Sequence, residues 1–200
     1  MERYKENEIS ILADILKNDG VICVPTDTVY GLCTRINSNE AYKKLVEIKN
    51  RPSNKSFPVM CKDKEQIKSI AEVDEKAEKL IDAFMPGAVT LVLNKKKEAF
   101  VNNRGLQDTD EIGIRMAPTK EIRELIEKIE SPIFMTSANK SGEEVCKSIE
   151  EIEKVFPNLD GILEGNILFG KSSTIINCRK DIKVQREGPI TSEQIKEVLK

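Results

Sequence analysis

The sequence predicts an α/β fold with a mixed sheet. Segments with apolar residues at helical spacing alternate along the chain with short apolar runs rich in β-branched residues, which are typical of buried strands. No linker or repeat interrupts this alternation. We therefore expect a single α/β domain over residues 1–200.

The first quarter of the chain is expected to form a helix, a buried strand and a second helix. The apolar face of the first helix consists of Ile9, Leu12, Ala13 and Leu16. Residues 21–24 are an uninterrupted apolar run, which predicts a strand buried on both faces that ends at Pro25. The second helix starts near Ser38 and ends by Arg51, because Pro52 disfavours a helical conformation in the residue before it.

The remaining elements continue the alternation. Helices are expected to begin at good N-cap residues, namely Asp63, Asp74, Thr119, Ser148 and Thr191. Strands are expected at the end of the segment 52–61, at 88–93, 112–116 and 132–138, and around Ile162, Ile175 and Val184. The charged segment from Lys95 to Asp110 is expected to be a mobile loop.

Composition removes several kinds of catalysis from consideration. The chain has no histidine, which excludes Ser-His-Asp and Cys-His catalysis and histidine-ligated zinc. Its five cysteines are odd in number and have no CxxC spacing, so we interpret them as buried thiols that form neither disulfides nor metal sites. Catalysis would have to come from Lys, Arg, hydroxyls, carboxylates, backbone amides or a bound ion.

Charge and hydropathy limit the partners that we expect. With 32 basic and 34 acidic residues the formal charge is -2, so no global field draws the chain to nucleic acid, and an anion site would be local. No apolar run approaches the length of a membrane span, and the polar start MERYKENEIS lacks a signal-peptide core. We expect a cytoplasmic protein that does not contact a membrane.

Residues 165–172, GNILFGKS, match the P-loop pattern G-x-x-x-x-G-K-[ST]. A P-loop needs small residues inside the loop and a helix after it, because backbone amides at the helix start cradle phosphate. Here the loop contains Ile167, Leu168 and Phe169, and residues 173–177 after it are strand-like. We interpret the match as coincidental and the segment as a polar loop that enters a strand.

The loop after the strand 21–24 carries two threonines around Asp27, followed by Tyr30 and Gly31. Open α/β sheets usually bind ligands at strand ends, so this loop is a candidate ligand site. An ordinary β-turn, in which Asp27 bonds its own backbone, accounts for the same residues equally well.

Cations and hydroxyls also stand at other strand ends. Arg115 interrupts the apolar strand 112–116, where it either reaches into a cleft or pairs with a surface carboxylate. The other polar residues of this kind are Ser137, Asn139 and Arg186, and three cations around one loop, Lys49, Arg51 and Lys55. Singly, each favours a solvated side chain. Together they suit binding of a polyphosphate and a carboxylate, with catalysis by positioning and charge neutralisation.

Seven segments resemble, in order, the motif series of the YrdC/TsaC family, the L-threonylcarbamoyladenylate synthases. They are PTDTVYGLC, KNRPSNKSFPV, PGAVTLVL, IGIRMAP, SANKSG, SSTIIN and VQREG. The resemblance runs from about Gly20 to Gly188 and is strongest to the short, single-domain type. It implies a YrdC-like twisted, open mixed sheet with flanking helices and a concave ligand cavity.

The resemblance also implies a reaction. L-threonine, bicarbonate and ATP would give threonylcarbamoyl-AMP and pyrophosphate, so the chain would be a nucleotidyltransferase of tRNA threonylcarbamoyladenosine modification. Mg²⁺ is expected with the ATP phosphates, with no metal held by the protein alone. A TsaD-type transferase complex would carry out the later transfer to tRNA, and a weak contact of this chain with tRNA is a further expectation.

Site residues follow from motif position in the resemblance. The residues expected to bind L-threonine are Thr28, Tyr30, Arg115, Ser137 and Ser173, with the Arg115 guanidinium on the carboxylate. Those expected to bind ATP are Lys49, Arg51, Lys55, Asn139 and Arg186. Lys49 and Arg51 are the expected catalytic residues, because cations there would neutralise the charge that builds on departing pyrophosphate.

Other hypotheses stay open at this point. A non-enzymatic RNA-binding protein of the same fold would recognise RNA by shape and phosphate contacts, although the near-neutral charge counts against it. YciO-type relatives keep these motifs with less certain activity, and sequence separates them poorly from the synthases. A carbamoyl-transfer domain of the hydrogenase-maturation kind shares the fold, but the acylphosphatase and zinc-finger segments expected beside it are not found in these residues.

Overall fold

The computed structural model describes residues 1–52, 55–99 and 110–200. Its strands are β1 (Arg3–Tyr4), β2 (Ile22–Val24), β3 (Gly31–Arg35), β4 (Val59–Cys61), β5 (Ala71–Glu72), β6 (Val89–Lys95), β7 (Glu111–Met116), β8 (Ile133–Ser137), β9 (Gly161–Leu163), β10 (Thr174–Asn177) and β11 (Lys183–Arg186). Its helices are a short 3-10 turn η1 (Glu6–Glu8), α1 (Ile9–Lys17), α2 (Asn39–Lys49), α3 (Lys64–Ile70), α4 (Glu75–Phe84), α5 (Lys120–Lys128), α6 (Ile149–Val155) and α7 (Ser192–Val198).

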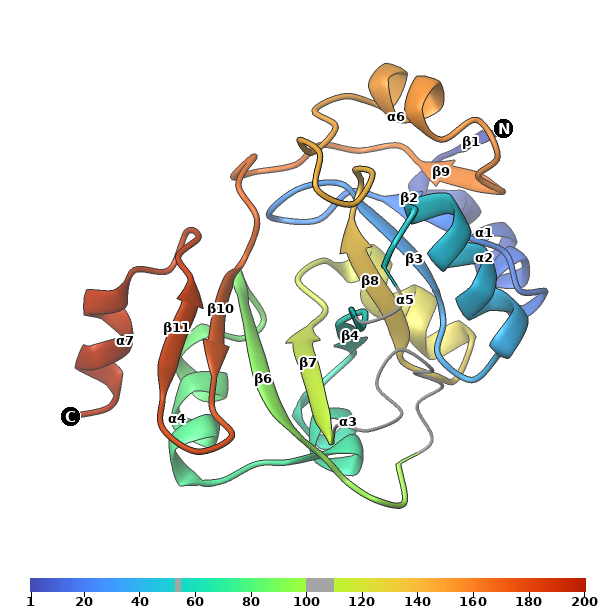
Figure 1. Ribbon diagram of the computed structural model, residues 1–200. Coiled ribbons are helices and arrows are strands. Elements are labelled where there is room, and N and C mark those ends of the chain that lie inside the picture. The colour runs from blue at the N-terminus through green and yellow to red at the C-terminus, as the bar shows by residue number, and fades with distance from the viewer. Residues whose placement is uncertain (53–54, 100–109) are drawn as a thin grey trace.

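These strands belong to one twisted, mixed sheet that is flanked by helices (Figure 1). The order across it is β1-β9-β2-β3-β8-β4-β7-β6-β10-β11, and β5 pairs with β6. The pair β4–β7 is parallel, for example, whereas β3–β8 is antiparallel. The predicted α/β class with an open mixed sheet is therefore confirmed.

β2 lies inside the sheet and is covered on both faces, as its apolar run predicts. It pairs in parallel with β9 and antiparallel with β3, and its three residues are fully buried. Cys23 faces one hydrophobic layer, whereas Ile22 and Val24 face the other. Successive side chains of a strand point to opposite faces, so a strand covered on both sides is apolar throughout.

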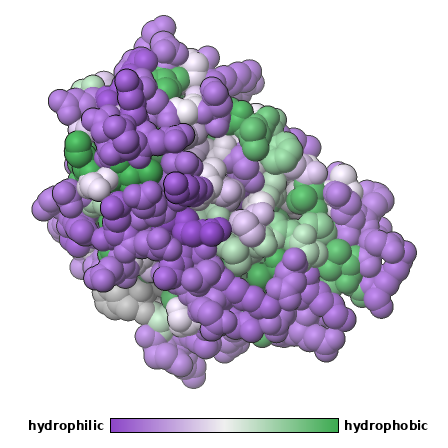
Figure 2. All heavy atoms as spheres, turned by 180° about the vertical axis from the view of Figure 1, so that it is seen from behind, coloured by the Kyte–Doolittle hydropathy of each residue, from purple (hydrophilic) through white to green (hydrophobic). Residues whose placement is uncertain are grey.

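Two hydrophobic layers hold the helices against the sheet. On one face α1 and α5 pack through residues such as Leu12 and Leu125. On the other face α2, α3, α4, α6 and α7 contribute, and Tyr42, Phe57 and Phe134 form an aromatic cluster with ring centroids 5.5 to 6.1 Å apart. Seen from behind, the surface is mostly hydrophilic, with hydrophobic residues exposed in patches, several of them in the right half of the view (Figure 2). No helix in the described ranges is long and apolar enough to span a membrane.

Helix capping places the polar loops. The predicted helix starts at Asp63, Asp74, Thr119, Ser148 and Thr191 are confirmed as N-caps, because a side-chain oxygen in each accepts a backbone N–H three residues on. Ser38, near which the second helix was expected to start, caps α2 in the same way. α2 ends where Asn50 adopts a left-handed conformation with φ 49°, directly before Arg51 and Pro52. Lys49 therefore stands in the last turn of α2, and Arg51 starts the exit loop.

β3 is the main element that the sequence pattern did not predict. Between Gly31 and Arg35 it has only three residues, Leu32, Cys33 and Thr34, which is too short a run to indicate a strand, and the residues before Gly31 suggest a loop. Hydrogen bonds to β2 on one side and β8 on the other stabilise it as a strand. The mobile loop expected from Lys95 to Asp110 falls mostly on residues 100–109, which lie outside the described residues.

The cysteines are buried and free of disulfides, which confirms their interpretation as thiols. They are Cys23, Cys33, Cys61, Cys146 and Cys178. Burial raises the pKa of each thiol, to about 12 in Cys178, so all five stay protonated at neutral pH. Protonated, buried thiols act as small apolar side chains and supply no nucleophile.

Truncation of Phe134 tests the aromatic cluster. Phe134→Ala is expected to lower the free energy of unfolding by about 3–5 kcal/mol, because it removes apolar contacts and leaves a cavity beside Tyr42 and Phe57. Urea unfolding followed by circular dichroism measures the change. The control Ile11→Ala alters a side chain that is 46% exposed and should change stability by less than about 0.5 kcal/mol. A loss no larger than the control's would contradict a core role for the cluster.

Candidate functional site

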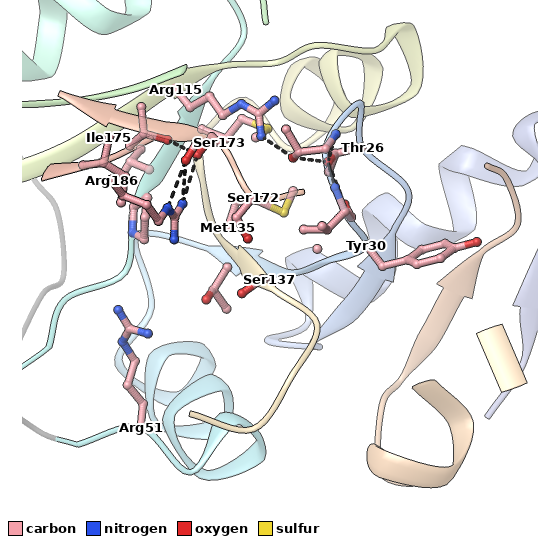
Figure 3. A pocket seen from close by; sticks show the side chains of 18 residues that line it. Thr26, Tyr30, Arg51, Arg115, Met135, Ser137, Ser172, Ser173, Ile175 and Arg186 are labelled. Carbon is pink, nitrogen blue, oxygen red and sulfur yellow. Dashed lines mark hydrogen bonds between the residues drawn. The ribbon is translucent and has the colours of Figure 1, made fainter. Parts of the chain in front are cut away.

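A cavity of about 200 Å³ opens along the middle strands of the sheet (Figure 3). Of the residues predicted from the sequence, it brings together Thr28, Tyr30, Arg51, Arg115, Ser137, Ser173 and Arg186 in its wall. Lys49, Lys55 and Asn139 do not line it. The cavity thus collects hydroxyls and guanidinium groups from strands and loops that are far apart in the sequence.

Arg115, on β7, is held by three hydrogen bonds. Its Nε donates to the carbonyl of Gly87 over 2.9 Å, Nη1 donates to Thr28 Oγ1 over 2.9 Å, and Nη2 donates to Asp27 Oδ1. The residue is 6% exposed. Burial lowers the pKa of Arg115, and the Asp27 carboxylate opposes that effect. Of the two sequence hypotheses, the cleft is confirmed, and the carboxylate partner is buried instead of lying on the surface.

The loop after β2 is built around Thr26, not around Asp27. Thr26 Oγ1 accepts the backbone N–H groups of Thr28 and Val29 over 3.1 and 3.2 Å and donates to the Val29 carbonyl over 2.6 Å. The two threonine hydroxyls also share a hydrogen bond of 2.9 Å. Because Thr26 organises the turn, the Asp27 side chain is available to contact Arg115.

Tyr30 lines the cavity, but its hydroxyl points away from it. The hydroxyl donates to the carbonyl of Gly165 over 2.9 Å, and Figure 3 shows the ring directed away from Arg115 and Ser137. The predicted contact of Tyr30 with a ligand is therefore limited to the part of the residue near the backbone.

Ser173 connects two strands at the other side of the cavity. Its Oγ is 2.8 Å from Thr90 Oγ1 on β6, and its carbonyl accepts two N–H groups of Arg186 over 2.8 and 3.0 Å. Burial lowers the pKa of Arg186, whose contacts are to neutral oxygen atoms. Thr90 was not identified from the sequence, although a single hydroxyl inside the apolar run AVTLVL was an available signal.

Lys49 lies behind Ser137 and is only 2% exposed. Its Nζ donates to the Ser137 carbonyl over 2.5 Å and to Asn139 Oδ1 over 2.6 Å, and Ser137 Oγ donates to the same Asn139 oxygen over 2.7 Å. Burial, and then the nearby charge of Arg51, lowers the pKa of Lys49 to about 7. Lys49 and Asn139 therefore hold the end of β8 from behind the cavity wall.

Arg51 reaches the cavity from the exit loop of α2 (Figure 3). Its guanidinium donates to the carbonyls of Lys55 and Ser56 and stands over the Phe57 ring, 4.5 Å from the centroid. Burial lowers its pKa. Lys55 itself is exposed and contributes its backbone carbonyl to Arg51, so the structure does not bring its side chain into the site.

The segment 165–172 is not a P-loop. No helix follows it, because the chain enters β10 at Thr174. Leu168 and Phe169 are 77% and 55% exposed, and Lys171 Nζ donates to the carbonyl of Gly188 over 3.3 Å. The interpretation of the match as coincidental is confirmed.

The arrangement suits anionic ligands better than acid-base catalysis. Among the described residues of the wall, those with a charge are Arg51, Arg115 and Arg186, and the other polar groups are mainly serine and threonine hydroxyls. In the described part of the chain no group of three or more His, Cys, Asp or Glu residues could hold a metal. Arginine matches carboxylates and phosphates geometrically, and hydroxyls orient polar ligands. The fold and the cavity define an α/β protein with a cavity at its strand ends whose lining suits a small anionic ligand.

Comparison with known proteins gives the family. The model of the family described as Sua5/yciO/yrdC, telomere recombination, matches residues 14–188. The chain belongs to this family.

Within the family, the chain is similar both to proteins named as threonylcarbamoyl-AMP synthases or Sua5 and to a YciO protein. A putative threonylcarbamoyl-AMP synthase of Methanocaldococcus jannaschii is 33% identical over 97% of this chain and 92% of its own length. Pyrococcus abyssi Sua5 complexed with L-threonine has a TM-score of 0.91 and 29% identity over 99% of this chain, which spans 60% of that structure. Escherichia coli YciO has a TM-score of 0.86 and 28% identity over 97% of this chain and 98% of its own.

The lowered pKa of Lys49 predicts a pH-dependent stability. An unfolded lysine titrates near 10.5, so between about pH 7 and 10 the unfolded chain binds more protons at Lys49 than the folded chain does. Below pH 7 the folded protein bears the full free-energy cost of burying the Lys49 ammonium group. As the pH rises above 7, this cost decreases by up to about 1.4 kcal/mol per pH unit. From pH 7 to 9 the unfolding free energy of the wild type should therefore rise relative to that of Lys49→Met.

Denaturant unfolding of the wild type and of Lys49→Met at several pH values measures the difference in their unfolding free energies. The contribution of cysteine titration is the same in both proteins and drops out of this difference. Lys43→Met, at an exposed lysine of α2, is the matched control and should show no such trend. A difference between wild type and Lys49→Met that is constant with pH would mean that Lys49 stays fully charged.

Proposed function

We propose that the chain is an L-threonylcarbamoyladenylate synthase. It would convert L-threonine, bicarbonate and ATP into threonylcarbamoyl-AMP, pyrophosphate and water, as a nucleotidyltransferase. The observation that carries the proposal is a single cavity in which three guanidinium groups face a set of hydroxyls. The name of the M. jannaschii relative and the L-threonine complex of P. abyssi Sua5 support it.

L-threonine would bind at the Arg115 side of the cavity. Arg115 would hold its carboxylate, and the hydroxyls of Thr28, Ser137 and Ser173 would contact its polar atoms. The amine would attack bicarbonate to form a carbamate with loss of water, and a carbamate oxygen would then attack the α-phosphorus of ATP. Tyr30 would shape the wall through its backbone, since its hydroxyl is bonded to Gly165.

ATP would bind on the side of Arg51 and Arg186. Their guanidinium groups would neutralise the triphosphate and stabilise the charge that builds on departing pyrophosphate. Lys49 and Asn139 would act by fixing Ser137, because both contact it from behind the wall. Lys55 would make no phosphate contact, because its side chain is exposed and does not line the cavity.

Mg²⁺ would enter with ATP, bound mainly by the phosphates and water. When bound, it would add positive charge to the leaving group. The product is a mixed anhydride, so a transferase must consume it; a TsaD-type complex acting on tRNA is the partner that we propose.

Pyrophosphate release tests the function. Purified protein with ATP and Mg²⁺ is expected to release pyrophosphate only when both L-threonine and bicarbonate are present, with threonylcarbamoyl-AMP detected by mass. Release that is indifferent to threonine would indicate a general nucleotide hydrolase instead. Absence of release from folded protein would contradict the proposal and favour a YciO-type or RNA-binding role, for which a steep salt dependence of RNA affinity is the next measurement.

Two arginine variants test the division of the cavity. Arg115→Ala should weaken L-threonine binding about 10–100-fold and ATP binding much less, because it removes charge-assisted hydrogen bonds to the carboxylate. Arg51→Ala should show the reverse selectivity. Isothermal titration with each ligand measures both constants, and Arg123→Ala, at an exposed arginine of α5, is the control. Equal losses for both ligands in both variants would contradict the assigned sides.

A further inference from the structure

The three arginines of the cavity wall differ in what balances their charge. Arg51 and Arg186 donate to backbone carbonyls, which carry no net charge. Within residues 1–52, 55–99 and 110–200 neither forms an ion pair. In this part of the chain no carboxylate balances either guanidinium group, and both residues line the cavity.

Arg115 is compensated by Asp27. The two side chains form an ion pair and are only 8% and 11% exposed, so water screens their charges little. Asp27 does not line the cavity, whereas Arg115 does. A ligand that binds next to Arg115 therefore contacts a guanidinium group whose charge is already balanced by the Asp27 carboxylate, which lies outside the cavity wall.

From this difference we infer that Asp27 determines which ligand binds at which end of the cavity. Its carboxylate makes the Arg115 end electrically balanced, and this end accepts a zwitterion, whereas the Arg51 and Arg186 end stays cationic and accepts the polyphosphate. The inference rests on the proposed function and deepens it, because it explains how one cavity sorts two anionic substrates.

Electrostatics and donor geometry agree on this assignment. A zwitterion brings a carboxylate and an ammonium group, so it adds no net charge to the balanced, buried pair; a simple carboxylate or a polyphosphate adds negative charge close to Asp27. Arg115 has five N–H groups, of which three are bonded to Gly87, Thr28 and Asp27. The two that remain can still bind a carboxylate, so the ion pair orients the guanidinium without blocking it.

The test compares three ligands on three proteins. The ligands are L-threonine, 2,3-dihydroxybutanoate, in which a hydroxyl replaces the ammonium group, and inorganic pyrophosphate. The proteins are the wild type, Asp27→Asn and Asp19→Asn. Asp19 is the matched control because it also pairs with an arginine, Arg35, over 2.6 Å, and it lies outside the cavity wall.

In the wild type, titration should show a preference for L-threonine over dihydroxybutanoate of at least about 10-fold, and pyrophosphate should bind without displacing L-threonine. Asp27→Asn should reduce that preference about 10-fold, strengthen pyrophosphate binding several-fold and make pyrophosphate compete with L-threonine. Asp19→Asn should leave all of these within about twofold of the wild type.

Equal weakening of both organic ligands by Asp27→Asn, with unchanged pyrophosphate binding, would mean that Asp27 only supports the structure, and would overturn the inference. If Asp27→Asn does not fold, competition between pyrophosphate and L-threonine in the wild type would overturn it as well. If the wild type does not bind L-threonine, the proposed function fails, but the role of Asp27 can still be tested with pyrophosphate. Stronger pyrophosphate binding by Asp27→Asn than by the wild type would support that role, and unchanged binding would refute it.

Discussion

The buried contact between Asp27 and Arg115 fixes the geometry of the cavity. Asp27 follows β2 and Arg115 lies on β7, and in the sheet β3, β8 and β4 stand between these two strands. A buried ion pair adds little net stability, because removing two charges from water costs about as much as their attraction returns. Its effect is therefore mainly on position: it holds a guanidinium in one orientation over the concave sheet and ties the loop after β2 to the opposite wall.

A second buried basic side chain, Lys49, holds the neighbouring wall in a similar way. Lys49 reaches from the last turn of α2 to the Ser137 carbonyl and to Asn139, and so connects a helix end to a strand end. A neutral amine has two N–H groups and can satisfy both acceptors, which is consistent with its lowered pKa. In both places one buried basic side chain contacts a hydroxyl-bearing residue of the cavity wall, Thr28 after β2 and Ser137 at the end of β8.

Much of the fold could be predicted from local patterns. The N-cap residues, the apolar run 21–24 and the P-loop match without a following helix each depend on a few neighbouring residues, and the structure agrees with all three. β3 could not be predicted in this way, because its hydrogen bonds come from β2 and β8 and not from its own short sequence. The site was predicted by residue type, but the turn role of Thr26 and the outward direction of the Tyr30 hydroxyl depend on distant contacts.

The sequence by itself determined the α/β class and several of the residues that line the cavity, and it indicated the kind of chemistry. Helical and strand periodicity, the absence of histidine and ordered motifs are all properties of the chain that need no coordinates. Only the tertiary structure showed which buried polar groups pair with each other, such as the carboxylate of Asp27 with the guanidinium group of Arg115. Asp27 and Arg115 are 88 residues apart, and Lys49 and Asn139 are 90 apart. Such pairs form because the sheet order brings their strand ends together, and Coulomb attraction in a buried site acts on distance in space, not on separation along the chain.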